Sequence, residues 1–203
     1  MGFYATRILP HLIELAMRQE ILASYRWRAL AEAAGSVLEI GAGSGRNLPL
    51  YGASASCVYA VEPSLELVQM AKRRAGEARL PVLLVRASAE ELPFRDGAFA
   101  TVVSTWTLCT IPDPLRALRE MRRVLMPGGR FAFVEHGLAP EAGVARWQQR
   151  LTPLWRHIAG GCHLDRKIDD LVRAAGFRVG ALETGYIKGP RVMAFLYQGW
   201  AQA

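Results

Sequence analysis

The chain has 203 residues, of which 51% are hydrophobic and 21% charged, and a formal net charge of +7 at pH 7. This length fits one α/β domain with a continuous core, and the composition excludes a disordered chain. No apolar run approaches the ~20 residues that span a bilayer, and no secretory leader is visible. We therefore expect a cytoplasmic protein without stable membrane insertion, which leaves peripheral membrane contact open.

Two helices are predicted over residues 3–34, where apolar residues recur at mixed helical spacings between charged ones. From residue 37 onward, short apolar runs alternate with helical patterns. Residues 135–163 form a stretch rich in Trp and Gly, for which no regular structure is predicted. The predicted strands are 37–40, 57–61, 82–85, 100–104, 131–134, 178–184 and 191–197, and the later predicted helices are 48–51, 65–75, 115–125 and 168–175.

Repeated strand–helix units of this length indicate parallel strands joined by right-handed crossovers. We predict an α/β fold with a Rossmann-like seven-stranded, mostly parallel sheet, helices on both faces and an N-terminal helical cap. A ligand should bind at the carboxyl ends of the strands. The expected organisation is a single domain over residues 1–203, with a cap (1–34), a cofactor-binding core (36–136), a substrate-side insertion (137–166) and a C-terminal helix with two strands (167–203).

Three glycines at alternate positions, Gly41, Gly43 and Gly45, follow the first predicted strand. Because glycine tolerates dihedral angles and contacts that a Cβ forbids, a flat cofactor can lie directly on this turn. A dinucleotide site would have its third glycine where Arg46 stands. Glu39, near the end of the strand, adds a negative charge that suits a cationic amino-acid tail better than a diphosphate. The pattern favours S-adenosylmethionine (SAM) over a dinucleotide.

A second acid, Glu62, follows the apolar strand 57–61 and is placed to accept both ribose hydroxyls. Pro63 and Ser64 open the next helix, with Ser64 as its predicted N-cap. Residues 87–94 follow the third strand, at the position that normally meets the base. These elements complete a nucleoside-binding pattern.

With residues 104–108 and 125–130, these elements resemble class I SAM-dependent methyltransferases over residues 36–136. The resemblance implies that Glu39 and the glycine turn hold the methionine part and ribose of SAM, and that Glu62 binds the ribose. The third element of that family often has an Asp that bonds adenine, where this chain has Ser88. The cofactor-binding residues expected on this basis are Glu39, Gly41, Ala42, Gly43, Gly45, Asn47, Glu62, Pro63, Ser64, Ser88, Ala89, Glu90, Ser104 and Trp106.

The acceptor side should include the residues that follow the fourth and fifth strands. In residues 108–109, 135–136 and 147–166 the chain resembles the animal alkyl-thiol methyltransferases and their uncharacterised bacterial relatives. That resemblance implies methyl transfer to a small apolar thiol, with an imidazole assisting because a thiol of pKa ~8.5 is only slightly ionised at neutral pH. The expected catalytic residues are His136, His163 and Cys109, and the expected substrate-binding residues are Tyr4, Thr107, Cys109, His136, Trp155, Cys162 and His163.

Other functions stay open from the sequence. The core also resembles quinone-pathway C-methyltransferases and bacterial phospholipid N-methyltransferases, and a SAM-binding regulator without catalysis is the alternative of another class. Packing is the alternative role of the acceptor-side histidines and cysteines.

Other kinds of partner are not expected. The three cysteines lack disulfide or zinc-knuckle spacing, so no metal is expected. Basic residues are dispersed, and residues 104–107 lack the Asn/Asp-Pro-Pro-aromatic motif typical of base-methylating enzymes. We expect a small-molecule acceptor and no nucleic-acid partner.

Overall fold

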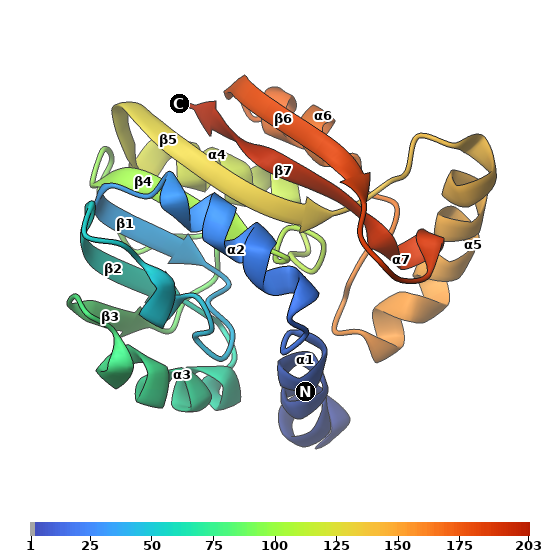
Figure 1. Ribbon diagram of the computed structural model, residues 1–203, viewed down its shortest axis with the longest axis horizontal. Coiled ribbons are helices and arrows are strands. Elements are labelled where there is room, and N and C mark those ends of the chain that lie inside the picture. The colour runs from blue at the N-terminus through green and yellow to red at the C-terminus, as the bar shows by residue number, and fades with distance from the viewer. Residues whose placement is uncertain (1–2) are drawn as a thin grey trace.

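The computed structural model describes residues 3–203, and its centre is a seven-stranded sheet in the order β3-β2-β1-β4-β5-β7-β6 (Figure 1). Neighbouring strands are parallel except for β7, which runs antiparallel to both β5 and β6. The predicted fold class is thereby confirmed. The strands are β1 (Gly35–Ile40), β2 (Ala55–Val61), β3 (Val82–Val85), β4 (Phe99–Thr105), β5 (Leu125–His136), β6 (Arg178–Tyr186) and β7 (Phe195–Gln202).

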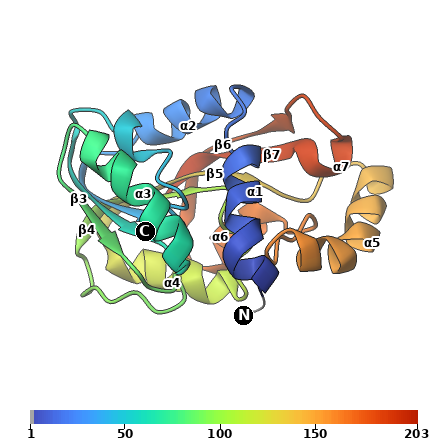
Figure 2. The same cartoon turned by 90° about the horizontal axis from the view of Figure 1, so that it is seen from below.

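Helices cover both faces of the sheet: α2 packs on one face, and α4 and α6 pack on the other (Figures 1 and 2). The N-terminal helix α1 lies beyond the carboxyl ends of the parallel strands (Figure 1). The helices are α1 (Leu9–Ala16), α2 (Ile21–Ala31), α3 (Leu65–Glu77), α4 (Pro114–Val124), α5 (Ala142–Ile158), α6 (Ile168–Ala174) and α7 (Arg191–Ala194), with a π-helical turn at Tyr4–Ile8 and a 3₁₀ turn at Leu48–Leu50.

The central strands are buried on both faces, which explains why they read as continuous apolar runs. Successive side chains alternate between two cores. Phe131 and Phe133 belong to the core under α4 and α6, where their rings stack with centroids 5.2 Å apart. Ala132, between them, belongs to the core on the opposite face.

The predicted helix start at Ser64 is confirmed, because its hydroxyl oxygen accepts a hydrogen bond from Leu67 N at 3.3 Å. The prediction for the last strand was wrong at its beginning. Pro190 O accepts a hydrogen bond from Met193 N at 2.8 Å, which closes a short helix over Arg191–Ala194, and the strand starts only at Phe195.

The prediction of no regular structure in residues 135–163 is wrong, because this stretch contains the 17-residue helix α5. The signal was present: apolar residues recur three and four positions apart. Pro153 inside the helix and the adjacent polar residues obscured that signal. The apolar series is Trp147, Leu151, Leu154, Trp155 and Ile158.

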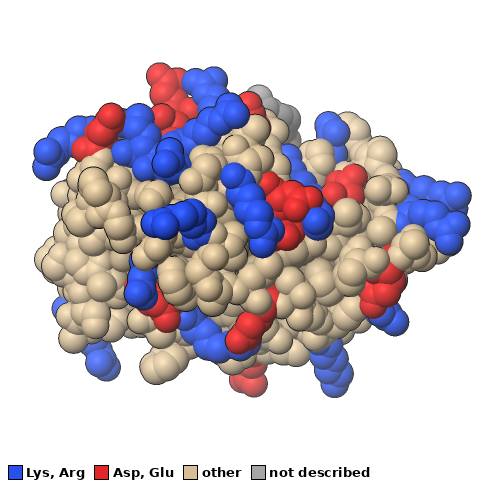
Figure 3. Space-filling view, turned by 90° about the horizontal axis from the view of Figure 1, so that it is seen from above, with Lys and Arg blue, Asp and Glu red and all other residues tan. Residues whose placement is uncertain are grey.

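Lys and Arg side chains are interspersed with Asp and Glu and with wide uncharged areas on the face shown in Figure 3. Within residues 3–203, no helix combines the length and the apolar character that crossing a bilayer would require.

Candidate active site

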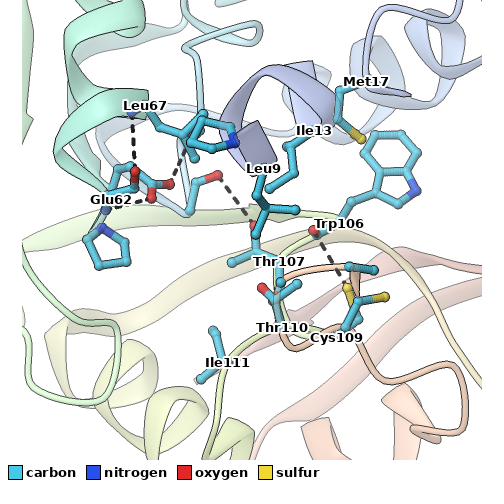
Figure 4. Close-up of a pocket in the computed structure, with 18 of the residues that line it drawn as sticks. Leu9, Ile13, Met17, Glu62, Leu67, Trp106, Thr107, Cys109, Thr110 and Ile111 are labelled. Carbon is cyan, nitrogen blue, oxygen red and sulfur yellow. Dashed lines mark hydrogen bonds between the residues drawn. The ribbon is translucent and has the colours of Figure 1, made fainter. Parts of the chain in front are cut away.

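A cavity of about 740 Å³ opens where β1, β2, β4 and β5 end, and α1 forms its opposite wall. Leu9 and Ile13 of α1, and Met17 directly after this helix, point toward the loop that follows β4 (Figure 4). The volume lies within the range of roughly 300–1,000 Å³ that is usual for small-molecule sites. The cavity is therefore the candidate active site.

The glycine turn forms the floor of the cavity at one end, which we call the cofactor end because the predicted cofactor residues Gly41, Gly43 and Glu62 line it. Gly41, Gly43 and Gly45 all have left-handed backbone angles, with φ of 64°, 56° and 80°. A Cβ on Gly41 would lie only 2.2 Å from Thr107 Cγ2, so the loop after β4 packs directly against this glycine. At Gly43 a Cβ would meet no atom closer than 3.9 Å, which leaves the backbone there open to a ligand.

Glu62 connects the glycine turn to the start of α3. Its Oε2 accepts a hydrogen bond from Gly43 N and its Oε1 accepts one from Ser64 N, both at 3.0 Å. Burial raises the pKa of Glu62, while these two backbone donors favour its charged form. Each carboxylate oxygen keeps acceptor capacity for a second donor. Glu62 lines the cavity and can receive two neighbouring hydroxyl groups.

Behind the glycine turn lies a closed polar network around Glu39. Asn47 Nδ2 donates to Glu39 Oε1 at 3.0 Å, and the Tyr51 hydroxyl donates to Oε2 at 2.9 Å. Arg26 Nη1 donates to Asn47 Oδ1 at 2.9 Å. Glu39 is only 1% exposed and is not part of the cavity wall. The network therefore supports the turn from behind.

Burial raises the pKa of Glu39 to about 7, against the opposing effect of its hydrogen bonds with Tyr51 and Asn47. The folded chain thus keeps a proton that the unfolded chain releases near pH 4.5. We expect the ligand-free protein to lose stability as pH rises from about 4.5 through 7, and the Glu39→Gln variant to lose less. Thermal unfolding of both proteins between pH 5 and 8 measures the difference, and parallel curves would contradict this assignment.

Ser88, Ala89 and Glu90 line the cavity beyond β3. The Ser88 hydroxyl donates to Glu90 Oε2 at 3.1 Å and accepts from Glu90 N at 3.2 Å. Glu90 Oε1 also accepts a hydrogen bond from Asp113 N at 2.7 Å. The hydroxyl group of Ser88 is thus already hydrogen-bonded within this turn. Ala89 offers an apolar side chain to the cavity.

Glu14 of α1 holds this helix over the cavity, and no sequence pattern singled this residue out. Glu14 accepts hydrogen bonds from the Ser44 hydroxyl, from Arg46 and from Arg74, the last at 2.9 Å. Burial opposes ionisation of Glu14, but these three donors hold its pKa below the usual range. Arg46, at the position where a dinucleotide site has its third glycine, is thus a partner of α1.

Replacing Glu14 with glutamine should loosen α1 without removing any apolar wall. Loss of this ion-pair cluster costs about 1 kcal/mol, so we expect SAM affinity to fall roughly fivefold. Hydrogen exchange in residues 9–16 should become faster. Titration with SAM and exchange mass spectrometry measure both effects, and the exposed Glu20→Gln serves as a matched control. Unchanged exchange in α1 would contradict the role of Glu14.

The turn after β4 is held by a buried acid of β5. Glu135 Oε1 accepts hydrogen bonds from the Ser104 hydroxyl at 2.7 Å and from Thr107 N at 3.1 Å, and Oε2 accepts one from Leu108 N at 3.1 Å. Burial raises the pKa of Glu135 to about 7 despite these donors. Ser104 consequently points to Glu135, and Glu135 fixes the turn that carries Trp106, whose φ of 51° is left-handed.

Trp106 contributes to the cavity wall between the cofactor end and the acceptor end. The Arg26 guanidinium lies 4.9 Å from the centroid of the Trp106 ring. One cation of the protein itself therefore already occupies a face of this ring.

The acceptor end of the cavity brings together two sulfurs and one imidazole. His136 Nε2 lies 3.0 Å from Cys162 Sγ, and these atoms and Cys109 Sγ all lie within 4.8 Å of one another. Cys109 and Cys162 are buried and His136 is half-buried. Hydrogen bonds from Cys109 and His136 lower the pKa of Cys162 against the effect of burial. The side chains come from the turn after β4, from the end of β5 and from the loop after α5.

His163 has a different position from the one expected. Its side chain is not part of the cavity wall; His163 Nδ1 lies 3.7 Å from Asp165 Oδ1. Its backbone N donates to Cys109 O at 2.8 Å, which joins the loop after α5 to the turn after β4. Arg166, which the sequence did not single out as a site residue, strengthens that junction by donating to the Ile111 carbonyl at 2.7 Å.

The cavity gathers most of the predicted site residues. Nine of the fourteen expected cofactor residues line the cavity. The other five do not: Glu39, Ala42, Gly45, Asn47 and Ser104. All expected substrate residues apart from His163 line the cavity. The lining members of the two sets are Gly41, Gly43, Glu62, Pro63, Ser64, Ser88, Ala89, Glu90 and Trp106, and Tyr4, Thr107, Cys109, His136, Trp155 and Cys162.

Comparisons with known proteins show that the chain is similar to methyltransferases. Residues 38–133 match the family described as methyltransferase domain. The thiol S-methyltransferase TMT1B of Rattus norvegicus is 34% identical over 154 residues, which are 73% of this chain and 62% of that protein. The phosphatidylethanolamine N-methyltransferase of Cereibacter sphaeroides is 38% identical over 137 residues, 66% of each chain.

Among solved structures, a SAM-dependent methyltransferase of Thermotoga maritima, described as a histamine N-methyltransferase candidate, superposes with a TM-score of 0.66 at 24% identity. The superposition covers 98% of this chain and 99% of that one. At this level of identity the likeness shows the fold.

The sheet order, the glycine turn and the acid after β2 define a class I SAM-binding fold, and residues 38–133 form a methyltransferase domain. SAM is the cofactor of this class. The chain spans about three fifths of the length of the rat thiol S-methyltransferase that it matches.

Proposed function

We propose that this methyltransferase moves the methyl group of SAM to a small apolar thiol. The observation that carries the proposal is the composition of the cavity, which runs from the glycine turn and Glu62 along an apolar wall to Cys109, His136 and Cys162. The similarity of the chain to thiol S-methyltransferases supports the same acceptor.

The residues at the cofactor end fit SAM. Gly43 leaves its backbone open to a flat ligand, and Glu62 presents two carboxylate oxygens for the ribose hydroxyls. Ala89 would pack against the adenine, and the carboxylate network around Glu39 would support the turn beneath the methionine part. When bound, SAM supplies an electrophilic methyl group on a sulfonium.

The residues at the acceptor end would hold an apolar thiol and favour its ionised form. Leu9 and Ile13 of α1 contribute apolar wall to the cavity, and an apolar wall strengthens electrostatic interactions near it. His136, which lies beside Cys162 and lines the cavity, would supply an imidazole near the acceptor sulfur. An ionised sulfur in line with the methyl group is the nucleophile that this chemistry requires.

The test is incubation of the full chain with methyl-labelled SAM and alkyl thiols of increasing length, beside the alcohol and amine of the same length. We expect labelled S-methyl product from the thiols, with higher kcat/KM as the alkyl chain lengthens within the cavity. Product from the amine or alcohol, and none from any thiol between pH 6 and 9, would overturn the proposal.

A lipid amine is the second candidate acceptor, because a bacterial phosphatidylethanolamine N-methyltransferase is 38% identical over the matched residues. Exposed apolar side chains on α1 and α5 also favour contact with a lipid surface; Leu15 is 63% and Leu154 is 68% exposed. Vesicles that contain phosphatidylethanolamine, added to the same assay, distinguish this acceptor, since only a lipid enzyme should label them.

A further inference from the structure

The cluster at the acceptor end has the donor set of a zinc site. Cys109 Sγ, His136 Nε2 and Cys162 Sγ lie within 4.8 Å of one another. In a tetrahedral zinc site with Zn–S of about 2.3 Å and Zn–N of about 2.0–2.1 Å, neighbouring donor atoms are roughly 3.5–3.8 Å apart. The pair His136 and Cys162, at 3.0 Å, would need to separate by only about half an ångström to admit the ion.

The loops that carry these donors are held by contacts from outside the cluster as well as within it. Glu135 fixes the turn that carries Cys109, through the amides of the two residues before it. Gly161, with a left-handed φ of 86°, turns the chain after α5 so that Cys162 faces the cavity. The hydrogen bond from His163 N to Cys109 O then joins the two loops. A site whose donors are positioned by their backbone is pre-organised for a ligand.

The donors and their surroundings select a soft ion with one free position. Two sulfurs and an imidazole suit zinc rather than magnesium or calcium. Trp155, Leu164 and Met193 pack around the two sulfurs. Over residues 3–203 this group offers three donors, and all three side chains line the cavity. Three protein ligands and one open position are typical of catalytic zinc, whereas structural zinc has four protein ligands.

We propose that Cys109, His136 and Cys162 bind a zinc ion whose fourth position takes the sulfur of the acceptor thiol. This inference rests on the proposed thiol acceptor. Coordination releases the thiol proton to solvent, because a zinc-bound thiol is deprotonated. The sulfur lone pair then forms the new S–CH₃ bond while the bond between the methyl carbon and the sulfonium breaks. Its electron pair remains on the sulfonium sulfur, giving S-adenosylhomocysteine, and no oxidant or reductant is consumed.

Metal content of the full chain, purified with reductant and dialysed, tests the site. We expect about one zinc ion per wild-type chain, and at least a tenfold lower content in Cys162→Ser and in His136→Ala. Cys57→Ser is the matched control, because Cys57 lies on β2 and does not line the cavity. The control should keep the wild-type zinc content.

Cobalt substitution tests the open position in the absence of SAM. The Co²⁺-loaded chain should show thiolate-to-cobalt charge-transfer bands, and an alkyl thiol should shift the visible bands of the metal. Chelation of wild-type zinc, followed by its return, provides a test that does not depend on the folding of any variant. Removal should lower thiol methylation at least tenfold, and the returned ion should restore it.

Two results would overturn the zinc site: equal metal binding by wild type and Cys162→Ser, or a Cys109–Cys162 disulfide in place of bound metal. Thiol methylation at full rate by the chelated chain would overturn the thiol-activating role of the ion, while leaving the proposed acceptor intact. Conversely, a zinc ion bound with the expected spectrum, but without methylation of any thiol, would contradict the acceptor and the thiol-activating role of the ion.

Discussion

Glu62→Ala should weaken SAM binding by roughly 100-fold. Two hydrogen bonds from ribose hydroxyls to this carboxylate would be lost, at about 1.5 kcal/mol or more each for charged partners, and 1.4 kcal/mol corresponds to a factor of ten. The variant would also leave Gly43 N and Ser64 N without their acceptor, which loosens the turn on which the cofactor lies. Calorimetric titration with SAM and with S-adenosylhomocysteine measures the loss for both.

Glu77→Ala provides the matched control, since Glu77 is an acid at the other end of α3 whose side chain is 49% exposed. Its SAM affinity should equal that of wild type. If Glu62→Ala binds SAM within threefold of wild type while remaining folded by circular dichroism, the assignment of Glu62 to the ribose is wrong.

Gly41→Ala should destabilise the fold by about 2–4 kcal/mol and abolish measurable SAM binding. The left-handed backbone costs roughly 1–2 kcal/mol for a residue with a Cβ, and the new methyl would lie 2.2 Å from Thr107 Cγ2. Thr107 cannot move freely, because its amide is bonded to the buried Glu135. Urea unfolding and SAM titration measure the two effects.

Gly52→Ala is the control for this change, because a Cβ at Gly52 would meet no atom within 4 Å. We expect its stability to lie within about 0.5 kcal/mol of wild type. Equal stability of the two variants would show that the contact between Gly41 and Thr107 does not constrain the turn.

The residues predicted to bind the cofactor could be picked out from the sequence because their determinants are local. Gly41 and Gly43 follow β1 directly and Glu62 follows β2 directly, so each residue is placed by the strand before it. Parallel strands end at one edge of the sheet, which brings these short motifs together without further information. The strands themselves were predictable because strands buried on both faces are continuously apolar.

The acceptor half could not be read in this way. Cys109, His136 and Cys162 lack any spacing that signals a shared site, and the sequence-based expectation was that no metal is bound. The helix α5, which leads the chain back to Cys162, was itself missed. Only the packed loops after β4 and α5, joined through His163 N and Cys109 O, make these three side chains neighbours.

The sequence by itself determined the class of fold, the order of its strands along the chain and the turn on which SAM would lie, since neighbouring residues encode each of these. The tertiary structure alone decided which distant side chains meet: Glu14 with Arg46 and Arg74, and the two cysteines with His136. The physical reason is that such contacts depend on how crossovers and loops pack, and no local periodicity or propensity reports that packing.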